Sequence, residues 1–193
     1  MRTKRARAFA IDFILLLLSF SIINHLFPDT EKINSLKASQ NKVLENYTSH
    51  HIDFYKYLKD YSIQYYNLAK EQQVIKIIYL CFVLFYFVLL PFIWKGRTLG
   101  TWLNHIQIER FDKGRLHIHQ LFTRNFVVIG LGYLIISTLF IYIIPSKYYF
   151  IVVSIVGLLQ IVVALFSLYM IMFTKEKRGI QDLISNTEMA KII

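Results

Sequence analysis

Cysteine is nearly absent from this chain, since Cys81 is the single one among 193 residues. An internal disulfide is therefore excluded, and cysteine usage leaves the redox compartment open. Two catalytic signatures are also missing, because the sequence has neither a Gly-x-x-x-x-Gly-Lys-Ser/Thr string nor a His-Glu-x-x-His string. Their absence argues against a P-loop nucleotide site and a zinc hydrolase. We expect no cofactor and no resident metal.

Charge is scarce in long stretches, and none occurs between Ile77 and Ile93. The chain is 55% hydrophobic and 16% aromatic, more than a soluble domain of this size usually carries. Crossing a hydrocarbon core takes about 20 helical residues, and four segments are long enough: 8–27, 74–94, 126–144 and 148–173. We predict an all-α fold, a single polytopic membrane domain over residues 1–193 with four transmembrane helices.

The N-terminus has a second interpretation, because basic residues precede an apolar run there, as in a signal peptide. Against this interpretation, Asp12 interrupts the apolar region and no small-x-small cleavage site follows it. We therefore expect the first helix to be retained.

Basic residues indicate the orientation, because Lys and Arg are retained on the cytoplasmic side. Residues 2–7 carry four of them, the loop 95–125 carries six and the tail 175–191 carries four. The insertion 28–73 is balanced, with six Lys and six acidic residues. We therefore expect both termini and the loop in the cytoplasm and the insertion outside, in a bacterial cytoplasmic membrane.

The net charge of +10 is then a topology signal plus attraction to anionic lipid head groups. No RNA- or DNA-binding motif accompanies it, so the expected partner is the lipid bilayer and not nucleic acid. A homo-oligomer and a protein partner at the insertion 28–73 are further expectations.

Apolar residues recur at helical spacing through the insertion 28–73 and predict two amphipathic helices with a break near 46–51. Tyrosines gather towards its end, as in an aromatic belt at a membrane interface. The insertion is either a helical cap on the bundle or a sensor and partner-binding surface.

The loop 95–125 begins with Gly96, Thr98 and Gly100 directly at the membrane face. Two glycines there allow a sharp change of direction or a close approach of another backbone. Alternation in 104–110 and again in 116–119, around a turn-like 111–114, predicts a short hairpin or an interfacial bend. His117 and His119 would share a face of that hairpin, but no third metal ligand is near them in sequence.

Asp12 is the first candidate functional residue, because a carboxylate inside a membrane helix costs roughly 2.5–3.5 kcal/mol at mid-depth and usually faces a partner or water. Arg5 lies about 10 Å away along the helix axis at 1.5 Å per residue, so Asp12 needs a partner from another helix. Arg124, where the third helix starts, is near the same depth. An arginine within reach would favour ionised Asp12.

The tail places apolar residues of 180–184 at i, i+3 and i+4, with Asp182 on the other side of that turn. It is either a surface-lying tail or part of a charge cluster. Arg5, Ala8 and Asp12, then Gly96-x-Thr98-x-Gly100, Arg124 and Arg178–Asp182 followed by Thr187 form an ordered set. This set resembles the RDD family of membrane proteins, named for one arginine and two aspartates.

The resemblance covers the membrane portion, while the insertion looks longer than the usual family linker. It implies that Arg5 and Asp12 are the first arginine and aspartate, and Asp182 the second aspartate. Two positions depart from the family pattern, because Thr101 stands where lysine is common and Gln181 where histidine is frequent. Transport of ions or solutes is the usual suggestion for the family, with cation/proton antiport proposed for some members.

Two functions follow. The first is a small transporter that exchanges cations and protons through Asp12, with Arg5 or Arg124 tuning its ionisation. The second is a non-transporting interaction or regulatory module, in which the Arg and Asp residues are a structural clamp. An intramembrane enzyme is not expected, because the spans offer serines but only His25 as a base, near the outer end of the first helix.

Overall fold

The computed structural model describes residues 2–192, and it is mostly helical. Three of its helical stretches are long and apolar enough to cross a membrane. They are α1 (Arg2–Leu26), α9 (Ser146–Phe173) and the stretch formed by α4 (Gln73–Leu84), the π-helical η1 (Phe85–Leu89) and α5 (Leu90–Ile93). Large apolar side chains on α1 and α9 are mostly exposed, as lipid-facing side chains are.

The third predicted span, 126–144, is not one straight helix. The chain there forms α7 (Ile118–Val128) and α8 (Leu131–Ile143), which meet at an angle of 80°. Gly130 lies between them with a φ of +82°. At 1.5 Å per residue α8 is about 20 Å long, shorter than a hydrocarbon core of about 30 Å. The described chain therefore has three candidate spans, or four if the bent pair counts as one.

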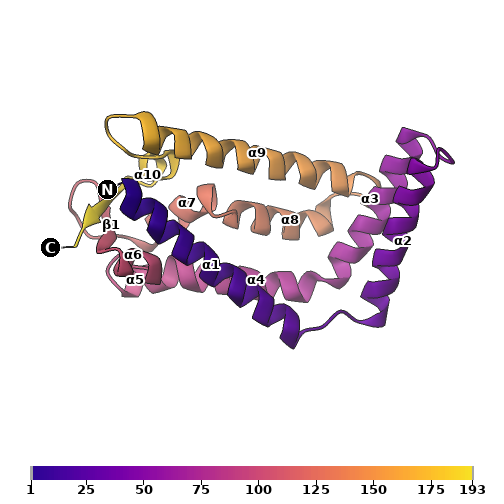
Figure 1. Cartoon of the computed structure of the whole chain (residues 1–193), viewed down its shortest axis with the longest axis horizontal. Helices are drawn as coiled ribbons and strands as arrows, with labels where there is room; N and C mark the ends of the chain where they lie inside the picture. The colour runs from indigo at the N-terminus through magenta and orange to yellow at the C-terminus, as the bar shows by residue number, and fades with distance from the viewer. Residues whose placement is uncertain (1, 193) are drawn as a thin grey trace.

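The insertion forms two antiparallel helices, α2 (Glu31–Thr48) and α3 (Phe54–Glu71), so its break falls at 49–53, close to the predicted 46–51. The hydroxyl of Thr30 caps α2 by accepting a hydrogen bond from the backbone of Ile33. α3 packs against α9, whereas α2 packs mainly against α3. Figure 1 shows both helices lying across one end of the bundle.

A small polar domain lies at the opposite end of the bundle, and it includes a sheet that an all-α fold does not have. It contains α6 (Leu99–Leu103), β1 (Ile106–Arg110), α10 (Ile180–Ile184) and β2 (Thr187–Lys191). β1 pairs antiparallel with β2, with Ile108 opposite Met189. Of the two alternatives predicted for 104–119, a short hairpin or an interfacial bend, the hairpin does not form, because the chain enters α7 at Ile118 and β1 pairs with β2 in the tail.

The chain runs between the two ends of the molecule through α1, then α4 to α5, then α7 with α8, and finally α9 (Figure 1). The two termini, α6 and the sheet therefore lie together at the end opposite α2 and α3. A hydrophobic core next to this end packs α4, η1, α7 and α8 together. It includes Val83, Phe87, Leu121 and Leu131, and Ile108 of β1 packs into it. The three basic regions of the sequence consequently share one end of the molecule.

Candidate functional site

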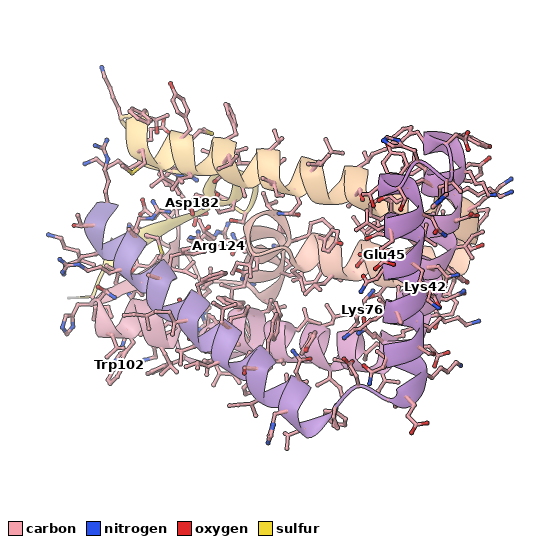
Figure 2. The ribbon with its side chains drawn as sticks, turned by 45° about the vertical axis from the view of Figure 1, so that its right-hand side comes forward. Lys42, Glu45, Lys76, Trp102, Arg124 and Asp182 are labelled. Carbon is pink, nitrogen blue, oxygen red and sulfur yellow. The ribbon has the colours of Figure 1, made fainter. Side chains whose placement is uncertain are left out.

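Asp182 lies at the centre of the polar domain and its side chain is fully buried. Arg5 of α1 donates from Nη2 to Oδ2 of Asp182 at 2.5 Å, and Arg124 of α7 donates from Nη1 to Oδ1. The backbone N–H of Gly179 donates to Oδ2 at 3.0 Å. Figure 2 shows Arg124 and Asp182 close together at the end of the bundle opposite α2. One carboxylate thus ties α1, α7 and α10 together.

The charges around Asp182 favour its ionised form. Burial alone would raise the pKa of this carboxyl, but Arg124 and Arg5 outweigh burial and hold the pKa below its usual value. Removing one partner of a buried ion pair typically costs about 3–5 kcal/mol, because the other charge stays behind unpaired. Asp182 is therefore favoured as a carboxylate at neutral pH, and its single negative charge is shared by two guanidinium groups.

Further hydrogen bonds join this cluster to its neighbours. Arg124 also donates to the hydroxyl of Thr187 at 3.0 Å, which connects α7 with β2. Gln181, at the position where histidine is frequent in the pattern that the sequence resembles, accepts a hydrogen bond from Ser167 of α9. Gln120 donates to the backbone carbonyl of Ser185 at 3.0 Å. Gln181, Asp182 and Thr187 are buried, so these bonds hold α10 and β2 against the spans, while Leu183 and Ile184 stay exposed.

Asp12 occupies a different place, between α1 and the start of α6, and is 6% exposed. Its Oδ1 accepts from the hydroxyl of Tyr86 at 2.6 Å and from the backbone N–H of Gly100 at 2.8 Å. Its Oδ2 accepts from the hydroxyl of Thr98 at 2.7 Å. Thr98 is the N-cap of α6, so Asp12 reinforces that cap from another helix.

The two glycines of the loop motif permit close packing of backbones, as expected from the sequence. A Cβ at Gly100 would lie 2.2 Å from the carbonyl oxygen of Ala8 and 2.7 Å from Cγ of Asp12. Ala8 itself is 1% exposed, so α1 and α6 touch at this point. A Cβ at Gly96 would lie 1.9 Å from the carbonyl oxygen of Ile108 in β1. Larger residues at either position would force the polar domain away from the spans.

The structure groups the candidate residues differently from the sequence analysis. Arg5 and Arg124 both pair with Asp182, and within residues 2–192 Asp12 forms no ion pair. Asp12 is instead held by neutral donors, and sequence reasoning missed Tyr86 among them. The available signal was a tyrosine in the middle of an uncharged span, which also contains Tyr79 near its start.

The described part of the chain contains no group of three or more His, Cys, Asp or Glu side chains that could hold a metal ion. His117 and His119 do lie together, with their rings stacked at 5.4 Å between centroids, and they remain a pair without a third ligand of this kind.

The sequence model described as the RDD family matches residues 2–186, nearly the whole chain and including all four Arg and Asp candidates. No curated protein sequence and no solved structure matches the chain.

Proposed function

Since the chain belongs to the RDD family, we propose that it is a multi-pass membrane module whose buried Arg and Asp residues are structural clamps. One clamp is Asp182 with Arg5 and Arg124, and the other is Asp12 with its three donors. Both attach the polar domain to the membrane helices. The module would act by binding a partner and not by moving ions.

The hydrogen bonding of Asp12 carries this proposal. All three of its partners come from the η1 and α6 region, and one is a backbone amide that cannot rotate away. A hydrogen bond contributes roughly 0.5–1.5 kcal/mol, and roughly 1.5–3 kcal/mol when its acceptor is charged. A carrier would have to break several such bonds in every cycle to expose the carboxylate, whereas a clamp keeps them. A hollow at the polar end and a smaller one beside α3 are lined by other residues, and Asp12 contributes to neither.

For placement, we propose four membrane passes with the polar domain and both termini in the cytoplasm of a bacterium. The gathering of the basic regions at one end supports this orientation. Trp94 and Trp102 also lie at that end, with ring centroids 5.6 Å apart, and Trp102 is 46% exposed. Tyrosines of α3 lie at the other end, so aromatic residues mark both expected interfaces.

For a partner, we propose a protein that binds the outer face of α2 or a second copy of this chain. α2 has one buried residue, Ile33. Lys42 and Glu45, labelled in Figure 2, are exposed on it, and Leu44 is 45% exposed. Within the described chain, α2 packs along one side only. Its outer side is therefore available for contact with another molecule.

The alternative is exchange of cations and protons at Asp12. It is favoured by the position of Asp12, a carboxylate buried in a helix long and apolar enough to span a membrane.

The substitution Asp12→Asn separates the two functions. It keeps the size of the side chain but loses part of its capacity to accept hydrogen bonds. If Asp12 is a structural clamp, we therefore expect the variant to have lower thermal stability in detergent and to assemble less well with its partner. A carrier site predicts a folded, stable protein that has lost only flux. Asp29→Asn, at an exposed residue, is the matched control. If Asp12→Asn is as stable as the control variant, the proposal is refuted.

A further inference from the structure

A hollow of about 400 Å³ lies at the polar end, where the end of β1, the first turns of α7 and the junction of α10 with β2 meet. Its volume is in the range of small-molecule sites, about 300–1,000 Å³. The lining residues are Arg110, His117, His119, Gln120, Thr123, Ile184, Ser185 and Asn186. Neither clamp carboxylate is among them, so the hollow is a separate feature.

The lining contains one guanidinium, two imidazoles, neutral polar groups and the apolar side chain of Ile184, and it contains no carboxylate. Arg110 pairs through Nη2 with Asp112 at 2.7 Å. Its Nε is buried and, within the described chain, has no hydrogen-bond partner. The side chain is 31% exposed and lines the hollow, so its outer N–H groups can be reached by a ligand there. The rings of His117 and His119 are both exposed and stacked with an interplanar angle of 15°. Two imidazoles and a guanidinium around one hollow favour an anionic ligand.

The start of α7 adds to this preference. α7 has 11 residues and begins at Ile118, between the two histidines. The N-terminus of a helix carries partial positive charge and unsatisfied N–H groups, which favour phosphate and other anions. Gln120, in the same turn, already bonds the backbone of His117 and Ser185, so the wall of the hollow is held in place.

We propose that this hollow binds a phosphate group carried by a small organic residue, either the head group of an anionic phospholipid or a soluble phosphate ester. Arg110 and the two histidines would contact the phosphate oxygens, and the remaining volume would hold the organic part. Leu183 and Ile184 of α10 are exposed beside the hollow, at 42% and 60%, as residues at a lipid surface are. The proposal goes beyond the proposed function, because a clamp protein and a carrier could both bind such a ligand here.

The test uses the full chain in nanodiscs. In one arm the discs contain phosphatidylcholine with one fifth phosphatidylglycerol, and native mass spectrometry measures retained phosphatidylglycerol. In the other arm the discs contain phosphatidylcholine alone, and calorimetry measures binding of glycerol 3-phosphate. Arg110→Gln is compared with Arg115→Gln, because Arg115 lies in the same loop, is exposed and does not line the hollow.

We expect Arg110→Gln to weaken binding by about tenfold or more, as loss of a charged hydrogen bond does, and Arg115→Gln to leave it nearly unchanged. Retention of phosphatidylglycerol identifies the lipid as the source, and binding of glycerol 3-phosphate identifies a soluble ester. No binding in either arm by the wild type overturns the proposal, and so does equal weakening by both substitutions, which would indicate diffuse charge. If Arg110→Gln fails to fold, the variant in which Gln replaces both His117 and His119 is measured instead. We expect it to bind the ligand more weakly than the wild type, and an unchanged affinity overturns the proposal.

Discussion

The substitution Asp182→Asn should cause the largest single loss of stability at the polar end. An asparagine fits the same space but leaves Arg5 and Arg124 without a compensating charge in a site where Asp182 is fully buried. Breaking a buried ion pair from one side costs about 3–5 kcal/mol. Because Arg5 is 11% exposed and Arg124 only 9%, water offers little replacement for the lost carboxylate. We expect a loss of free energy of unfolding within that range.

The matched control is Glu188→Gln, which removes a carboxylate from the same domain. Glu188 pairs with Lys113 at 2.6 Å, but both side chains are partly exposed, and such pairs contribute about 0–1 kcal/mol. Unfolding in a graded detergent series, followed by circular dichroism, measures both variants against the wild type. A loss for Asp182→Asn no greater than that for Glu188→Gln would refute the account of Asp182 as a clamp.

Three further predictions concern the same residues. Tyr86→Phe removes one donor to Asp12 and should cost roughly 0.5–3 kcal/mol of stability, with the upper part of the range for an ionised carboxylate. A loss below the error of the unfolding measurement would contradict the hydrogen bond. Gly100→Ala should destabilise the protein strongly, because its Cβ would overlap Ala8; Gly114→Ala, at an exposed turn, is its control, and equal stabilities would argue against the close contact. Because the pKa of Asp182 is lowered in the folded protein, its stabilising contribution is present above the unfolded carboxyl pKa of about 3.9 and is lost as pH falls through the folded value. Unfolding measured from pH 7 downwards should therefore show an acid loss that Asp182→Asn reduces, and identical acid profiles would exclude this contribution.

The membrane character of the chain could be predicted from the sequence, because it depends on the length and apolarity of single segments. The uncharged run ending at Ile93 and the run 148–173 both correspond to long helices. The bend at Gly130 could not be predicted in this way, since apolarity is continuous across it and the change of direction is a backbone event. The strand partner of β1 was missed because the periodicity of a strand does not reveal its distant neighbour.

The candidate site shows the same division between local and distant information. Helical spacing places Asp12 and Ala8 on one face of α1, and both are buried in the structure. The pairing of Arg5 with Asp182 joins residues 177 positions apart, and no local pattern encodes it. Tyr86 was overlooked because a tyrosine in a span is more often an apolar packing residue than a donor to a carboxylate.

Ion flux through the wild-type protein tests the central claim most directly. Purified protein is inserted into liposomes, and uptake is followed under gradients of Na⁺, K⁺, Li⁺ and H⁺, with protein-free liposomes as the baseline. The clamp account predicts flux equal to that baseline under every gradient, because Asp12 keeps its three donors. Flux above the baseline that Asp12→Asn abolishes, in a variant that still folds and inserts, would contradict the account and assign Asp12 to transport.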